Sequence, residues 1–142
     1  FYATELRYGI LHDIAWKVWQ DVPIDLSMGH VNQIWQGDAN AYLARSFPLC
    51  ESPPAVYNMT GTQTLSVRDL AIGFGRLLER QPTFVGEERP TALLGNTTAL
   101  VEKLGPPETA IDEVVDWMAH WVRSGGVSHG KPTKYESRTG EF

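Results

Sequence analysis

The sequence contains little cysteine and no long apolar run. Cys50 is the only cysteine among 142 residues, so no disulfide can form within the chain, and this usage is typical of a reducing compartment. No apolar run approaches the roughly 20 residues that cross a bilayer, and the opening FYATELRYGIL has no secretory signal pattern. We therefore expect a cytoplasmic protein with no membrane partner. The absence of an initiator Met suggests that the chain is part of a longer protein.

Clusters of basic residues are also absent. The formal net charge is -5, whereas proteins that bind nucleic acid need a basic face for the phosphates. The same balance gives no attraction to anionic membranes. We therefore expect no nucleic-acid partner.

The motifs of several enzyme classes are missing as well. The sequence has no G-x-G-x-x-G fingerprint, no phosphate loop and no Gly-x-Ser-x-Gly elbow. Gly61 stands alone where a strand is expected to turn into a helix, which favours an ordinary connection over a cofactor loop. His and Cys lack the spacing of metal ligands, and a solvated helix face explains Asp112, Asp116 and His120. We assign no catalytic, cofactor-binding or metal-binding residue in this chain, although a dispersed Ser-His-Asp arrangement stays open.

The hydrophobic pattern predicts short strands between amphipathic helices. We expect one domain of 1–126 and a polar, Gly-rich tail of 127–142, with a fold of the α/β class. The expected helices are 5–20, 39–47, 66–78, 96–104 and 109–124, and the expected strands are 23–28, 31–36, 55–61 and 83–86. The tail is expected to be either loose or wrapped onto the domain.

Four of these helices have candidate caps at their starts, and Asn96 is the candidate for the helix that ends at 104. Asp38 precedes one helix, Ser66 with Asp69 forms a capping-box pattern, and Thr109 with Asp112 repeats it. For Asp38 a catalytic role is the alternative, but a cap already accounts for an Asp at this place.

The first predicted helix carries more aromatic surface than one buried face needs. Tyr8, Trp16 and Trp19 lie off its apolar stripe. Either a second body packs there or the helix is central in this domain; periodicity does not separate the two.

Two stretches carry a resemblance to a known family. They are PIDLSMGHVNQIWQGDANAYLARSF and AVYNMTGTQTLSVRDLAIGFGRLL, and they resemble the C-terminal half of NAD-dependent epimerase/dehydratase proteins, the extended short-chain dehydrogenase/reductases. Asp38 matches the Asp of a Val-x-Asp-x-Ala motif, 58–61 resembles Asn-Val-Gly-Gly, and 65–70 resembles LSVREL. NTTALVEKLG and AIDEVVDWMAHWV are similar to the family's last two helices, so the likeness runs from about Tyr2 to Gly126.

The resemblance implies a fold and a role. The fold would be the C-terminal substrate-binding portion of an extended Rossmann-type protein, with short strands and four or five helices. NAD or NADP would bind to a Rossmann half that is absent here, and no Tyr is followed four residues later by the Lys of the family's Tyr-x-x-x-Lys pair. The chain would therefore bind no cofactor and would not catalyse alone. Its partners would be the missing N-terminal half and a small-molecule substrate, a sugar or sugar nucleotide.

The resemblance also implies candidate substrate-binding residues: Tyr2, Trp35, Gln36 and Arg89. A core position for Trp35 and a solvated loop position for Arg89 are the alternatives. Many nucleotide-sugar members have Arg near position 31 or 32 and Asn near position 1, where this chain has Val, Asn and Phe. These departures weaken a nucleotide-sugar assignment.

Two other functions remain open. One is a free-standing, non-catalytic binding or interaction module of related fold, and the other is an independent hydrolase. A glycine-rich strand–turn–helix and Tyr-x-x-x-Lys encoded upstream would favour the enzyme, and a start codon directly before Phe1 would favour the module.

Overall fold

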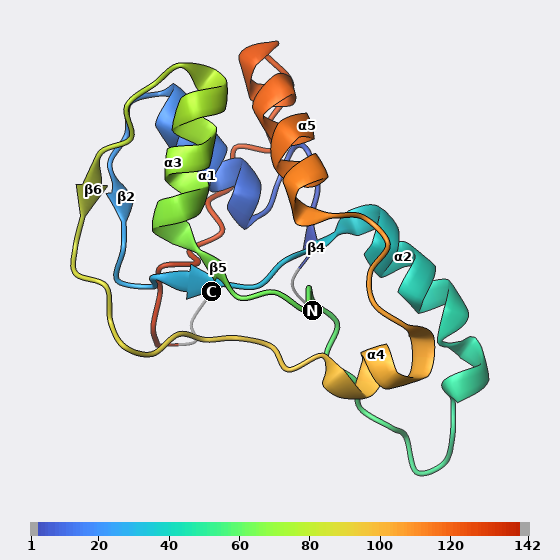
Figure 1. Ribbon diagram of the computed structural model, residues 1–142. Coiled ribbons are helices and arrows are strands. Elements are labelled where there is room, and N and C mark those ends of the chain that lie inside the picture. Colours follow the sequence, from blue (N-terminus) through green and yellow to red (C-terminus); the bar gives the residue numbers. More distant parts are fainter. Residues whose placement is uncertain (1–2, 140–142) are drawn as a thin grey trace.

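The computed structural model describes residues 3–139 of the chain, and its fold is of the α/β class (Figure 1). The helices are α1 Ile10–Trp19, α2 Gln36–Arg45, α3 Val67–Leu78, α4 Thr98–Leu104 and α5 Ile111–Arg123, with a short 3-10 helix at Phe47–Leu49. The strands are β1 Ala3–Thr4, β2 Ile24–Asp25, β3 His30–Val31, β4 Ile34–Trp35, β5 Leu65–Ser66 and β6 Phe84–Val85. The predicted class, short strands with four or five helices, is confirmed.

The strands form three separate pairs rather than one sheet. β1 pairs with β4 and β2 with β6 in parallel, while β3 pairs with β5 antiparallel. Each strand has two residues, so backbone pairing ties loops together and the helices supply most of the buried surface.

The larger core lies between α1, α3 and α5, which pack together at one end of the molecule (Figure 1). Phe74 and Met118 are fully buried there, together with Leu11, Ile14 and Val114. These positions recur at helical spacing, so the amphipathic pattern placed the core faces correctly. Leu77 of α3, by contrast, is 38% exposed.

A smaller core lies at the other end, between β4, α2 and α4 (Figure 1). It contains Ile34, Ala39, Tyr42 and Leu100. The Tyr42 hydroxyl donates a hydrogen bond of 2.5 Å to the carbonyl oxygen of Gly105, which joins α2 to the end of α4. β4 therefore passes between the two cores.

Several predicted elements differ from the observed ones, and α2 begins at Gln36 rather than residue 39. α1 begins at Ile10 rather than residue 5, because Glu5 and Tyr8 pair across a turn and Gly9 has φ of 120°. The expected strand at 55–61 is absent and this segment is a loop. A β-rich composition does not make a strand where no partner lies alongside.

The four predicted caps had different outcomes. Asn96 accepts a hydrogen bond of 3.0 Å from the Thr98 N–H, although the N-cap of α4 is Thr97. Ser66 caps α3 as expected, because its hydroxyl accepts a hydrogen bond of 3.1 Å from the backbone N–H of Asp69. Asp38 lies inside the first turn of α2, which begins at Gln36. The N-cap of α5 is Ala110 rather than Thr109, and the Glu113 side chain accepts a hydrogen bond from the Ala110 N–H.

The C-terminal tail wraps back onto α1. The Asp13 carboxylate accepts hydrogen bonds of 2.8 and 2.5 Å from the backbone N–H and hydroxyl of Thr133. Tyr135 is only 4% exposed and packs with the larger core, and Arg138 donates to the carbonyl oxygens of Ser27 and Thr91. Of the two expected tail arrangements, the structure has the wrapped one.

α1 keeps part of its aromatic surface exposed. Tyr8, just before it, is 37% exposed and Trp16 is 36% exposed. His12 is buried and its ring stacks on Trp16 with 5.9 Å between centroids. Within residues 3–139, no helix has the length and apolar character to span a membrane.

Candidate functional site

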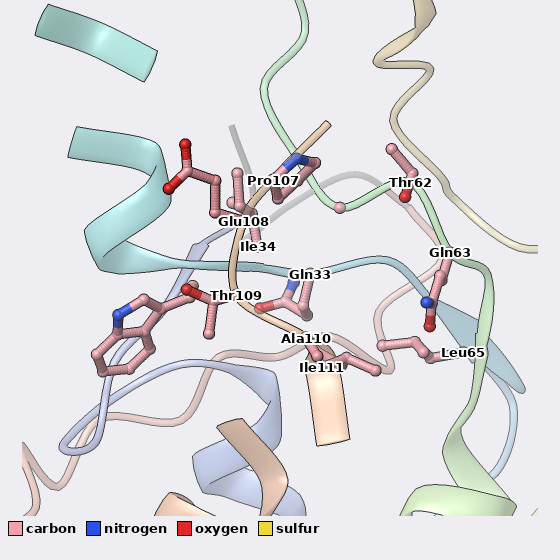
Figure 2. Close-up of a pocket in the computed structure, with 12 residues that line it drawn as sticks. Gln33, Ile34, Thr62, Gln63, Leu65, Pro107, Glu108, Thr109, Ala110 and Ile111 are labelled. Atoms are coloured by element: carbon pink, nitrogen blue, oxygen red, sulfur yellow. The ribbon is translucent and has the colours of Figure 1, made fainter. Parts of the chain in front are cut away.

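A cavity of about 230 Å³ lies where three segments distant in sequence meet (Figure 2). Residues 33–35 come from the end of the β3–β4 segment, residues 61–65 precede α3, and residues 107–111 form the turn into α5. We call it the Gln33 cavity, since the Gln33 side chain is drawn at the centre of its lining (Figure 2).

Gly61 allows two of these segments to approach closely. A Cβ atom at position 61 would lie 2.0 Å from the carbonyl oxygen of Gln33. The Thr60 hydroxyl also donates a hydrogen bond of 3.0 Å to the carbonyl oxygen of Asn32. Gly61 is thus required by close backbone packing.

A second cavity, of about 320 Å³, lies beside the same Gly61–Thr62 segment. We call it the Asn32 cavity, and its lining includes Asn32 and the residues 94–98 and 101–102. The Asn32 amide donates to the carbonyl oxygens of Gly61 and Gly95, at 3.3 and 2.7 Å, and accepts from the Gly95 N–H at 3.2 Å. One side chain therefore holds together the segments that line both cavities.

Gln33 is buried although it is polar. It is 5% exposed, and its amide nitrogen donates a hydrogen bond of 2.9 Å to the carbonyl oxygen of Asn32. Its Oε1 has no hydrogen-bond partner within residues 3–139. Buried polar atoms are normally paired, so this unpaired oxygen departs from the usual pattern in a residue that lines the cavity.

The turn into α5 is fixed by polar contacts from other elements. The Asp38 carboxylate on α2 accepts a hydrogen bond of 3.1 Å from the backbone N–H of Thr109. Asp38 therefore holds the wall of the Gln33 cavity across 71 residues of sequence, instead of capping its own helix as predicted.

The structure places two predicted substrate-binding residues at or beside this cavity. Trp35 lines it, half-buried, and its ring meets that of Trp117 edge-on with 5.4 Å between centroids. Gln36 follows directly, and its amide donates to the Asn40 side chain at 3.2 Å.

The other two predicted residues are not brought to it. Arg89 is exposed in the loop after β6 and lines neither cavity. Tyr2 lies outside the described residues. The substrate role of all four residues stays a prediction.

The described residues contain no Rossmann sheet. The strands form three two-residue pairs, with no parallel sheet that feeds a glycine-rich turn into a helix. Among residues 3–139, no group of three or more His, Cys, Asp and Glu side chains is arranged to hold a metal ion. The Gln33 cavity combines polar acceptors and hydroxyls with apolar side chains.

Sequence analysis missed Gln33 and Asn32. Residues alternate between faces along an extended segment, so Gln33 and Trp35 share one face and Asn32 lies on the other. Gln33 and Trp35 line one cavity, and Asn32 lines the other. A polar residue in the middle of VNQIWQ was the signal, because an ordinary core strand would carry an apolar residue there.

Comparison with known proteins gives matches in structure. No protein-family model and no curated protein matches the sequence. The structure is similar to that of UDP-glucuronic acid 4-epimerase from Bacillus cereus in complex with NAD, with a TM-score of 0.67 and 10% identity. It is also similar to UDP-glucose 4-epimerases from Thermus thermophilus with NAD (TM-score 0.62, 12% identity) and from Thermotoga maritima with UDP-glucose (0.63, 11%).

These matches cover most of this chain but less than half of each neighbour's chain. Each covers 87% of this chain but 43 or 44% of the neighbour's chain, so this chain spans less than half the length of the proteins it resembles. The matched part has short strands and five helices and no Rossmann sheet within residues 3–139. The chain therefore has the fold of the C-terminal half of NAD-dependent epimerase/dehydratase proteins, the extended short-chain dehydrogenase/reductases.

Proposed function

We propose that this chain is the substrate-binding part of an NAD(P)-dependent epimerase, dehydratase or reductase that acts on a sugar or a related small molecule. The observation that carries the proposal is the coverage: 87% of this chain matches less than half of enzymes crystallised with NAD. An N-terminal Rossmann half would supply the nicotinamide cofactor and the Tyr-x-x-x-Lys pair that this sequence lacks.

The Gln33 cavity supports a binding role for this chain. It joins polar groups to apolar side chains such as Ile34, Leu65 and Ile111, which is the usual composition of a small-molecule site. The half-buried Trp35 and the adjacent Gln36 would contact the substrate, and Tyr2 and Arg89 would join them when the second half closes the cleft. The single, exposed Cys50 fits a cytoplasmic location for this enzyme.

The proposed division of labour also accounts for the exposed aromatic surface near α1. Tyr8 and Trp16 are each more than a third exposed, and large exposed aromatics often mark a contact surface. The N-terminal half would supply that contact.

Cofactor titration tests the proposal. The longest protein that the gene encodes and the 142-residue chain are titrated with NAD and NADP by calorimetry. We expect the longer protein to bind one equivalent of cofactor and the 142-residue chain to bind none. Stoichiometric binding or unaided turnover by the 142-residue chain would contradict the proposal, as would a start codon directly before Phe1.

A further inference from the structure

The charges around both cavities are unusual for a site that would hold a phosphorylated ligand. Among the described residues, no Lys, Arg or His lines the Gln33 cavity or the Asn32 cavity. Each cavity instead has one carboxylate, Glu108 in the first and Glu102 in the second. Phosphate sites in proteins are built from basic side chains or helix N-termini. The negative charge of the residues that line these cavities therefore opposes phosphate binding.

Basic side chains near these segments are engaged elsewhere. Arg68, on the helix that follows the cavity segment, pairs with Glu88 at 2.9 Å and lies over the Phe84 ring at 4.8 Å. Arg45 donates to the carbonyl oxygen of Leu104. Within residues 3–139, neither side chain lines a cavity.

Two backbone N–H groups just before α5, which adjoins the Gln33 cavity, are engaged by carboxylates. The backbone N–H of Thr109 donates to Asp38, and that of Ala110 donates to Glu113. These two carboxylates add negative charge at the turn that lines the cavity.

The acceptor oxygens that line the Gln33 cavity favour a ligand that carries hydrogen-bond donors. Gln33 Oε1 is a buried acceptor without a partner in the described chain, and Glu108 adds a carboxylate at the rim. The hydroxyls of Thr62 and Thr109 can donate or accept. A ligand rich in hydroxyl groups satisfies all of these, since each hydroxyl can donate to an acceptor and still accept.

From this charge pattern and the unpaired Gln33 oxygen, we infer that the Gln33 cavity takes an uncharged, polyhydroxylated ligand rather than a nucleoside diphosphate sugar. This inference rests on the proposed function and narrows its substrate class. Gln33 would accept a hydrogen bond from a ligand hydroxyl, while Trp35, Ile34 and Ile111 cover the ligand's apolar faces. A diphosphate at this wall would lie near Glu108 with no opposing cation, and like charges in contact oppose binding.

Matched ligands test the inference on the longest protein that the gene encodes. Methyl glycosides of glucose, galactose, xylose and N-acetylglucosamine are each compared with the corresponding UDP-sugar by calorimetry. We expect at least one glycoside to bind about tenfold more tightly than its UDP-sugar. Tighter binding of a UDP-sugar than of its glycoside would overturn the inference, and so would failure of all four glycosides to bind.

Variants identify the residues responsible. Gln33→Met keeps the side-chain length and removes the acceptor, so glycoside affinity should fall about tenfold. Gln81→Met, at an exposed position away from the cavity, is the matched control and should leave affinity unchanged. Glu108→Lys should raise UDP-sugar affinity about tenfold. Equal glycoside affinity in the Gln33 and Gln81 variants would contradict the role of Gln33.

Two further measurements distinguish a misfolded variant from a wrong inference about the ligand. The comparison of ligands in the unmodified protein does not depend on how well the variants fold, and circular dichroism reports folding of each variant. Cofactor binding by the longer protein tests the proposed function separately. If that protein binds NAD or NADP but prefers UDP-sugars, only the inference about ligand charge is wrong.

Discussion

Position 61 shows how a single atom can limit the choice of residue. A Cβ atom there would lie 2.0 Å from the Gln33 carbonyl oxygen, well inside contact distance. Backbone atoms cannot yield as the end of a flexible side chain can. The carbonyl belongs to the residue at the centre of the cavity, so a change at position 61 reaches the candidate site directly.

We expect Gly61→Ala to lower the free energy of unfolding by about 3 kcal/mol, because the new methyl group forces two backbone segments apart. Urea unfolding measures the change. The matched control is Gly73→Ala inside α3, where a Cβ atom would meet nothing within 4 Å. The control should gain roughly 1 kcal/mol from helix propensity. Equal effects of the two substitutions would refute the close-packing explanation.

Asn32 is a second position where one residue affects a larger region. Its amide makes three hydrogen bonds to the backbones of Gly61 and Gly95 while only 8% exposed. Each bond is local in space but spans 29 or 63 residues of sequence. Sequence spacing holds no sign of such contacts, which is why the residue was noticed only as a departure from the resembled family.

Helix starts are decided at the scale of the element. Ser66 was recognised because its hydroxyl acts on a backbone N–H three residues later, entirely within local sequence. The same pattern at Thr109 was misleading: Asp38 from another helix accepts from the Thr109 N–H, and the N-cap of α5 is Ala110.

Substitution of the two residues distinguishes a real cap from an apparent one. Ser66→Ala should lower the free energy of unfolding by about 1 kcal/mol, since the Asp69 N–H loses its acceptor. Thr109→Ala should change it by less than about 0.5 kcal/mol, because the Thr109 hydroxyl does not cap α5. Chemical denaturation of both variants provides the measurement. A larger loss in Thr109→Ala would restore Thr109 as the cap.

The tail is held to α1 by an ionised side chain. Burial of the Asp13 carboxyl group acts to raise its pKa, but the His12 ring 4.0 Å away, hydrogen bonds from Thr133 and the charge of Lys17 outweigh it. The net result is a pKa below the ordinary value of 3.8. Since the folded-state pKa is the lower one, the stabilisation is complete above the unfolded value and is lost as pH falls through the folded value.

We therefore expect the tail to loosen below about pH 4, the region of an unperturbed Asp pKa. Tail loosening is followed by amide hydrogen exchange of 129–138 between pH 5 and pH 2. Asp13→Ala should show fast exchange throughout this range and a loss of about 2 kcal/mol in stability at pH 7. Asp116→Ala, at an exposed position on α5, should keep the pH dependence. A pH-independent tail in the unmodified chain would contradict the role of Asp13.

At the scale of the whole molecule, one hydrophobic core lies at each end and β4 passes between the two (Figure 1). The Gln33 cavity lies at this junction, because its lining comes from segments that belong to both ends. The tail completes the larger core by burying Tyr135. The expected division into a domain of 1–126 and a tail of 127–142 stays a prediction. Substitution of Tyr135 tests whether the two segments fold as separate units.

We expect Tyr135→Ala to cost about 4 kcal/mol, because it leaves a cavity in the core cluster of α1, α3 and α5. Tyr135→Phe should be neutral or slightly stabilising, since the buried hydroxyl has no hydrogen-bond partner within residues 3–139. Removal of 127–142 should cost at least as much as Tyr135→Ala, as measured by urea unfolding. A truncated chain as stable as the original would show that 1–126 folds independently.

The sequence by itself determined the class of fold, the amphipathic helices, the cap at Ser66 and the family resemblance. These depend on periodicity and on contacts within a few residues, which a linear pattern contains. Only the tertiary structure decided that 55–61 is a loop, that Asp38 holds the start of α5, and that Gln33 lies beside a cavity with its oxygen unpaired. Those features arise where segments separated by tens of residues meet, and their positions depend on packing of the whole chain rather than on any local sequence.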